Sequence, residues 1–160
     1  MAFVMEILEL RDWYTQSQFE ELKRLMSELS DRVNFTQTDL MLVLKDGNCH
    51  LYVILDGDHI IGCATLCVFH SPTGAKASIE DVVVSSTYRG QHLGRQLMEY
   101  VLEQAKMFAP IELHLTSKPK RIAANKLYQS LGFQRKETNC YQLFIPVTAQ
   151  EGQTPLCTGD

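Results

Sequence analysis

The chain lacks the long apolar runs that mark membrane proteins. It has no stretch of about 18 consecutive apolar residues, the length that a bilayer-spanning helix requires. Its N-terminus has too few consecutive apolar residues for a secretory signal, and its ending, Cys-Thr-Gly-Asp, is not a lipidation motif. From these absences we expect a cytoplasmic location and no membrane partner.

The cysteines lack the spacing of a zinc site. They are odd in number and contain no C-x-x-C pair, which predicts reduced thiols. Cys63 and Cys67 lie four positions apart in an apparent strand and share one face, which favours buried small apolar side chains over metal ligands. The sequence therefore predicts no metal. The five cysteines are Cys49, Cys63, Cys67, Cys140 and Cys157.

The chain also lacks an excess of positive charge. Its 15 Lys and Arg against 19 Asp and Glu give a net charge of −4 at pH 7, so any basic site must be local, and we expect no nucleic-acid partner. A length of 160 residues, 45% of them hydrophobic, suits a single core. We expect one domain over residues 1–146. Residues 147–160 contain few large apolar side chains, which predicts a peripheral or disordered tail.

What the sequence does contain is an ordered succession of strand and helix patterns. Alternating apolar residues predict a first strand over 4–10. An amphipathic stripe then predicts a helix with Ser17 as its N-cap and Glu20 as its capping-box partner. Thr36 and Thr38 both offer caps for a short second helix.

The middle of the chain predicts a hairpin and a meander. Strands over 50–55 and 59–69 are joined by Asp56-Gly57-Asp58, a strong tight-turn pattern, and a turn at 71–74 leads into a valine-rich strand. We expect these three strands to be antiparallel neighbours. The remaining expected elements are a helix over 94–108, a strand over 111–117, a helix over 120–131 and a strand over 134–145.

The residues between the valine-rich strand and the next helix form a candidate anion site, Arg89-Gly90-Gln91-His92-Leu93-Gly94. Gly90 permits backbone angles closed to other residues, and Gly94 lets the helix begin close to a neighbour or a ligand. Backbone N–H groups at a helix start have no internal partner, and the helix dipole with Arg89 and Arg95 favours an anion. The stretch suits a diphosphate, although a plain structural turn has the same pattern.

A second stretch makes the first one more specific. Residues 111–133 combine a strand, Ile-Glu-Leu-His-Leu-Thr-Ser, with a helix that ends Ala-Ala-Asn-Lys-Leu-Tyr-Gln-Ser-Leu-Gly-Phe. Both stretches, in this order and at this separation, resemble the GCN5-related N-acetyltransferase (GNAT) superfamily, whose members transfer acetyl from acetyl-CoA to amines. Glu-Asp-Val-Val-Val-Ser with Arg-Gly-Gln-x-Leu-Gly is similar to the glucosamine 6-phosphate acetyltransferases. The second half looks more like bacterial-type members that act on small amines.

The resemblance implies a fold and a co-substrate. The fold is a GNAT-like α/β (α+β) fold, with a mixed, mostly antiparallel central sheet flanked by about four helices. The co-substrate is acetyl-CoA, bound in part by main-chain groups of the valine-rich strand. The residues that the resemblance assigns to acetyl-CoA binding are Val82, Val83, Val84, Arg89, Gly90, Gln91, His92, Leu93, Gly94, Arg95, Arg121, Asn125 and Tyr128.

Two residues depart from the family pattern. His92 stands where many members have the first glycine of Arg-x-x-Gly-x-Gly, but main-chain amides and not that side chain would bind a diphosphate. Arg121 occupies the usual asparagine position, which fits either an added contact to a CoA phosphate or a solvated surface charge.

The last predicted helix has two distinct faces. Arg121, Asn125 and Tyr128 lie at i, i+4 and i+7 and share one face, which we expect to meet a ligand. The other face, with Ala123, Leu127 and Leu131, is expected to pack on the sheet.

Direct acetyl transfer needs an unprotonated amine, hydrogen bonds to the developing oxyanion and an acid for the departing thiolate. The resemblance assigns the acid to Tyr128, the tyrosine of the Leu-Tyr-x-x-x-Gly-Phe pattern. Glu80 and Asp81 are alternatives for the base. Strand alternation places them on opposite faces and groups Glu80 with Val82 and Val84, unless a bulge reverses the assignment. Some family members use water in place of a side-chain base.

The sequence thus predicts an N-acetyltransferase for the primary amine of a small polar acceptor. One alternative is specifically a glucosamine 6-phosphate N-acetyltransferase, and another is a non-catalytic acyl-CoA-binding module. In family members the helix after Thr36 usually covers the acceptor, so its apolar residues fit either core packing or a lid. A lone strand over 134–145 would leave an unpaired edge, which predicts a homodimer through that strand.

Overall fold

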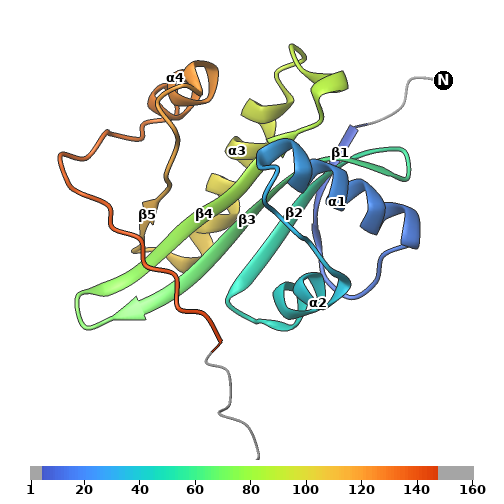
Figure 1. Cartoon of the computed structure of the whole chain (residues 1–160). Coiled ribbons are helices and arrows are strands. Elements are labelled where there is room, and N and C mark those ends of the chain that lie inside the picture. Colours follow the sequence, from blue (N-terminus) through green and yellow to red (C-terminus); the bar gives the residue numbers. More distant parts are fainter. Residues whose placement is uncertain (1–4, 148–160) are drawn as a thin grey trace, which may run out of the picture.

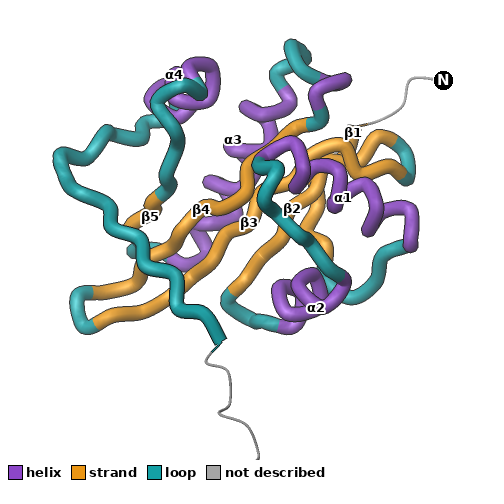
Figure 2. The backbone as a smooth tube through the Cα atoms, viewed as in Figure 1, coloured by secondary structure: helices purple, strands orange, loops and turns teal. Residues whose placement is uncertain are grey.

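Five strands lie side by side in the order of the chain and form one mixed sheet (Figures 1 and 2). In the computed structural model, which describes residues 5–147, neighbouring strands are antiparallel except that β5 runs parallel to β4. This confirms the predicted fold class and the predicted meander. The strands are β1 (Met5–Leu10), β2 (Cys49–Asp56), β3 (His59–Ser71), β4 (Gly74–Val84) and β5 (Glu112–His114).

The tight turn between β2 and β3 fixes the register of the central strands. Asp56 pairs with His59, and Gly57 between them has a φ of 59°, an angle that glycine adopts without steric cost. In the middle of β2, Val53 and Ile54 point to opposite faces of the sheet, and both are fully buried. The sheet must therefore be covered by other elements on both faces.

Helices cover both faces of the sheet. In Figure 1, α1 and α2 lie in front of the sheet and α3 lies behind it, while α4 lies beyond β5. The buried residues accordingly form two clusters: α1 and α2 pack on one face with Val53, Cys63 and Val83, and α3 packs on the other with Ile54 and Ile79. The helices are α1 (Gln16–Leu29), α2 (Gln37–Lys45), α3 (Leu93–Ala105) and α4 (Ile122–Ser130).

The predicted N-cap of α1 is wrong by two residues. Thr15, and not Ser17, caps the helix: its hydroxyl accepts from the Gln18 N–H at 3.1 Å, and the Gln18 side chain accepts from the Thr15 N–H at 3.0 Å. The Gln18 amide also donates to the carbonyl of Asp58 at 3.1 Å, a contact that no local pattern reveals. This distant contact holds Gln18 in the capping position.

The second helix begins as predicted. Thr36 caps α2 and exchanges hydrogen bonds with Asp39. Leu40 is fully buried and belongs to the core, whereas Met41 and Leu42 are exposed. Core packing therefore explains only part of the apolar pattern of this helix.

The chain after α4 contradicts the prediction of a long strand. Residues 134–147 form no strand, and β5 is also much shorter than the predicted strand over 111–117. A strand needs a paired neighbour, and a three-residue β5 offers little edge for one. The strand on which the predicted homodimer depended is thus missing. Residues 1–4, with the start of the first predicted strand, and 148–160, with most of the predicted tail, lie outside the described residues.

The described helices are short. Within residues 5–147, none combines the length and the apolar character needed to span a membrane.

Candidate functional site

A β-bulge in β4 decides how its carboxylates point. Thr65 of β3 pairs with Glu80 but Cys63 pairs with Val83, so Asp81 and Val82 together oppose one residue of β3. Asp81 takes up the extra residue with a φ of 53°. The bulge reverses the simple alternation, because Ile79 before it and Val82 after it both pack with the core on the α3 side, whereas Val83 packs with the core on the α1 side.

The bulge places the two candidate bases differently. Alternation before it puts Glu80 on the face that α1 and α2 cover, where the Ser78 hydroxyl donates to its carboxylate. Partial burial raises the pKa of Asp81, and the negative charge of Glu80 raises it further. A base role for either residue stays a prediction.

The edge of β4 that faces away from β3 is only partly paired. β5 pairs with Lys76–Ser78 alone, so among the described residues the edge from Ile79 to Val84 has no strand beside it. Figure 1 shows β4 running on past β5 toward the start of α3. Main-chain groups of Val82–Val84 that point to this edge therefore have no strand to bond, and ligand binding there stays a prediction.

Beyond β4, a loop presents a series of backbone N–H groups. After a 3-10 turn at Ser86–Tyr88, Gly90 has a φ of 81° and His92 a φ of 59° before α3 begins at Leu93. Within the described part of the chain, the backbone N–H groups from Gly90 to Gly94 donate no hydrogen bond. Consecutive unpaired N–H groups at a helix start form an anion site.

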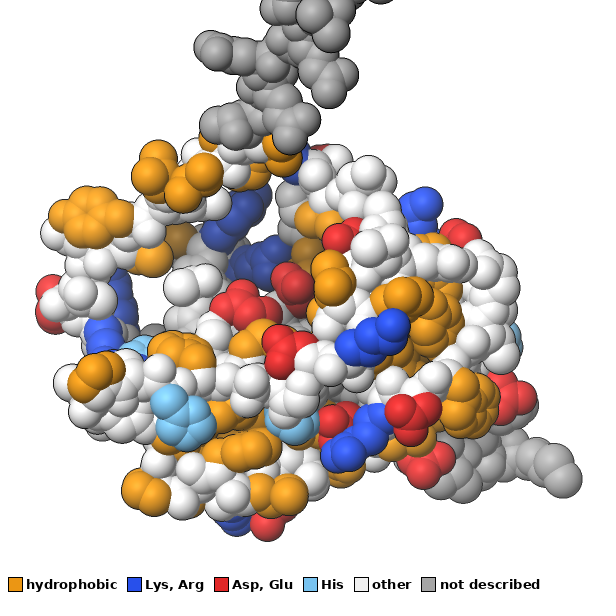
Figure 3. Space-filling view, turned by 90° about the horizontal axis from the view of Figure 1, so that it is seen from below, with side chains coloured by type: hydrophobic (Ala, Val, Ile, Leu, Met, Phe, Trp, Pro, Cys, Tyr) orange, Lys and Arg blue, Asp and Glu red, His pale blue; other side chains and the backbone are white. Residues whose placement is uncertain are grey.

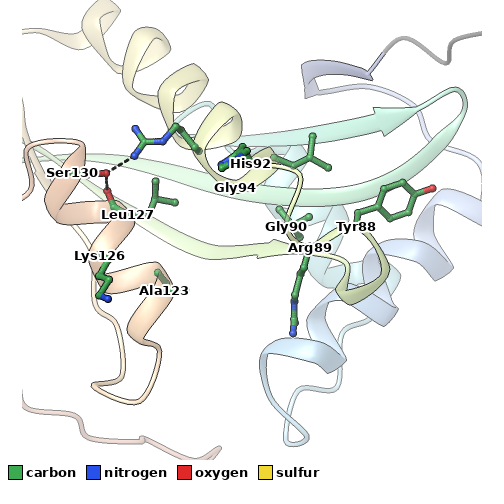
Figure 4. Close-up of a pocket in the computed structure, with 13 residues that line it drawn as sticks. Tyr88, Arg89, Gly90, His92, Gly94, Ala123, Lys126, Leu127 and Ser130 are labelled. Atoms are coloured by element: carbon green, nitrogen blue, oxygen red, sulfur yellow. Dashed lines mark hydrogen bonds between the residues drawn. The ribbon is translucent and has the colours of Figure 1, made fainter.

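A cavity of about 590 Å³ opens between this loop and α4 (Figure 4). Val84, Gly90 and Gly94 line one side, and Ala123 and Leu127 line the other. His92 and Leu93 also line it, whereas Gln91 is exposed and does not. The cavity thus extends from Val84, at the end of the unpaired edge of β4, to the loop with the unpaired N–H groups, whereas Val82 and Val83 do not line it.

The three arginines predicted to bind phosphate all have protein partners. Arg89 lies 3.3 Å from a carboxylate oxygen of Glu28. Arg95 donates to the Ser130 hydroxyl at 2.7 Å, a bond drawn in Figure 4. Arg89 and Arg95 still line the cavity. Arg121, which donates to a backbone carbonyl at 3.1 Å, does not.

Helix α4 differs in part from its predicted orientation. Ala123 is exposed to the cavity, so the prediction that it packs on the sheet is wrong, while Leu127 contacts both cavity and core. The Asn125 side chain donates to the Lys118 carbonyl at 3.1 Å and holds the turn before the helix. The first turn of α4 forms part of the cavity wall, so the small side chains of this turn face the cavity and not the sheet.

Tyr128 packs edge-on against Phe133, with ring centroids 6.2 Å apart. Its hydroxyl makes no hydrogen bond to any residue within 5–147, and burial raises its pKa. Tyr128 does not line the cavity, although its neighbour Leu127 does. Its role as the acid stays a prediction.

Sequence reasoning missed Tyr88 and Ser130, which line the cavity together with Lys126. The Tyr88 hydroxyl donates to Asp56 at 2.8 Å, and this hydrogen bond is the main reason that its pKa is raised. Tyr88 stands directly before the Arg-Gly-Gln motif in the sequence, and this position could have identified it as a residue of the site. Lys126 and Ser130 flank the Leu127 that the helical pattern already singled out.

Seen from below, the surface of the molecule is hollowed (Figure 3). Asp and Glu side chains gather at this hollow, with Lys and Arg side chains deeper inside it. Among residues 5–147, no group of three or more His, Cys, Asp or Glu side chains is arranged to hold a metal ion.

Comparison with known proteins agrees with this geometry. The model of the acetyltransferase (GNAT) family matches residues 7–133. A probable glucosamine 6-phosphate N-acetyltransferase from Drosophila melanogaster is 31% identical over 119 residues, which are 69% of this chain and 53% of that protein. The chain thus spans about half the length of this curated relative.

Solved structures share the fold. An aminoglycoside acetyltransferase from an uncultured soil metagenomic sample, in complex with trehalose, has a TM-score of 0.74 and 20% identity over 89% of this chain and 96% of that one. AAC(6')-Iy, in complex with the bisubstrate analogue CoA-S-monomethyl-acetylneamine, has a TM-score of 0.70 and 16% identity over 89% and 99%. Because the family model extends from β1 through α4 and so includes the bulged strand, the loop and both cavity walls, this chain belongs to the GNAT family of acetyltransferases.

Proposed function

We propose that this protein transfers an acetyl group from acetyl-CoA to the primary amine of a small polar acceptor. One observation carries the proposal: a cavity that extends from the end of the unpaired backbone edge of β4 to a run of unpaired N–H groups from Gly90 to Gly94. A donor with a diphosphate at one end and amide groups along its length matches this combination.

Two segments of the chain would bind different parts of acetyl-CoA. The N–H groups from Gly90 to Gly94 would hold the diphosphate, and the free edge of Val82–Val84 would hold the pantetheine amides. Bound acetyl-CoA supplies the thioester, from which the acceptor amine displaces the thiol. The chain's own task is to position the thioester and to move protons.

Tyr128 is suited to protonate the departing thiolate. A phenol is protonated at neutral pH, burial raises the pKa of Tyr128 further, and no described residue accepts a hydrogen bond from its hydroxyl. Glu80 and Asp81 are suited to draw a protonated amine toward the bulge and to accept its proton. The raised pKa of Asp81 makes this carboxylate a stronger base than an ordinary aspartate.

The test measures thiol release from acetyl-CoA against a panel of glucosamine 6-phosphate, glucosamine, amino acids, polyamines and peptide N-termini. We expect release that depends on one class of amine, with the acetylated product identified by mass spectrometry. Tyr128→Phe should lower kcat roughly 10²-fold and leave CoA binding nearly unchanged. Tyr141→Phe is the matched control, because Tyr141 is 88% exposed on the segment after α4. An unchanged kcat in Tyr128→Phe removes the acid role.

Two outcomes of the panel lead elsewhere. Binding of CoA without thiol release under any amine would support an acyl-CoA-binding module. A kcat/KM for glucosamine 6-phosphate far above that for glucosamine would support the second candidate acceptor, which the resemblance to the Drosophila melanogaster protein favours.

A further inference from the structure

We infer that the last turn of α1 is a clamp that holds both walls of the donor cavity, which makes Glu28 and Arg121 positioning residues for acetyl-CoA binding. The clamp consists of the Glu28 carboxylate and the Leu29 carbonyl with their partners Ser86, Arg89 and Arg121. Its role in donor binding rests on the proposed function.

The first wall is the loop before α3. The Glu28 carboxylate accepts from the Ser86 N–H at 3.0 Å and from the Ser86 hydroxyl at 3.5 Å, and it lies 3.3 Å from the Arg89 guanidinium. Figure 4 shows Arg89 extending away from Gly94 toward the pale blue helix. These contacts fix the loop directly before Gly90, where its unpaired N–H groups begin.

The second wall is α4. Arg121 is the N-cap residue of this helix, and its guanidinium donates to the Leu29 carbonyl at 3.1 Å across 92 positions of sequence. Leu29 ends α1, where carbonyls have no partner inside the helix and the dipole favours a cation. Because α4 contains no fully buried residue and no side-chain cap, this contact and the Asn125–Lys118 hydrogen bond fix the N-terminal end of the helix.

The clamp is itself anchored to the core. Phe19, Leu22, Leu25 and Met26 bury one face of α1 against the sheet, so its last turn cannot move freely. Both walls of the cavity are therefore tied to α1, in addition to the direct Arg95–Ser130 hydrogen bond between them. If both walls are already ordered in the free protein, ligand binding does not include the entropy cost of ordering them.

The first experiment compares hydrogen exchange in the ligand-free full chain. Arg121→Ala should speed exchange several-fold in α4, and Glu28→Ala should speed it in residues 85–94, while Lys23→Ala, an exposed change on the same helix, should alter neither. Unchanged exchange in both segments overturns the clamp. This result does not depend on any activity, so it separates failure of the clamp from failure of the proposed function.

The second experiment measures binding of CoA and of S-acetylpantetheine, which lacks the diphosphate. Glu28→Ala and Arg121→Ala should each raise the Kd for CoA roughly 3- to 10-fold, and Glu28→Gln and Arg121→Lys should recover part of the loss. For Arg121→Ala the loss should persist with S-acetylpantetheine. A loss confined to CoA would instead mean that Arg121 binds a phosphate directly, and this outcome overturns its positioning role.

Discussion

His92 offers a direct test of how the loop presents its N–H groups. It is the N-cap residue of α3 and has φ 59° and ψ 14°, in the left-handed region that glycine favours. Its side chain makes no hydrogen bond to any of the residues 5–147. Many family members have glycine at this position, so His92→Gly should relieve the backbone without removing a contact.

The expected change in the free energy of unfolding is the difference between two opposing effects. A non-glycine residue in the left-handed region costs about 1–2 kcal/mol, and glycine loses more backbone entropy on folding, about 0.5–1 kcal/mol. His92→Gly should therefore raise the free energy of unfolding by about 0.5–1 kcal/mol, which corresponds to about 1–4 °C in Tm for a domain of this size.

Urea denaturation of the wild type, His92→Gly and His92→Ala measures this difference. Alanine keeps the Cβ atom and thus the backbone penalty, so His92→Ala should stay within about 0.5 kcal/mol of the wild type. Equal stability of the two variants would refute the reasoning. Both variants should also keep CoA affinity within about twofold if, as proposed, main-chain N–H groups and not the imidazole bind the diphosphate. A clear loss of affinity in both would assign binding to the imidazole.

Three further changes test the core, a cap and a surface ion pair. Leu97→Ala, at a fully buried position of α3, should lower the free energy of unfolding by about 2–5 kcal/mol in urea denaturation, and a loss below about 1 kcal/mol would contradict the packing described. Thr36→Ala removes the N-cap of α2 and should lower the free energy of unfolding by about 1 kcal/mol in the same assay. Thr38→Ala, inside the first turn of the helix where the side chain is not the cap, should lower it less. The hydrogen bond to Glu21 raises the pKa of His59 above its ordinary value of 6.5. The His59–Glu21 pair therefore stabilises the folded protein fully below pH 6.5, and this stabilisation is lost as the pH rises through the raised pKa. The stability gap between wild type and His59→Gln should thus be larger at about pH 5.5 than at about pH 8.5, and an equal gap would contradict the pairing.

Local patterns in the sequence predicted most of the elements. The hairpin at Gly57, the stripe of α1 and the loop from Gly90 to Gly94 depend on interactions between residues a few positions apart. Backbone sterics, helix periodicity and capping act over a few positions, so the residue types in a short segment are enough to predict them. The strand predicted over 134–145 failed because a strand depends on a partner that periodicity does not reveal.

The tertiary structure alone decided how the site is assembled. The bulge at Asp81 follows from the register between β3 and β4, and it separates Glu80 from Val82. The contacts of Glu28 and Arg121 span 58 and 92 positions of sequence. Such contacts exist only once the whole core has packed, because the position of each element is the joint result of all its neighbours. The sequence by itself determined which segments carry the chemistry, and packing determined which of their side chains hold the cavity open.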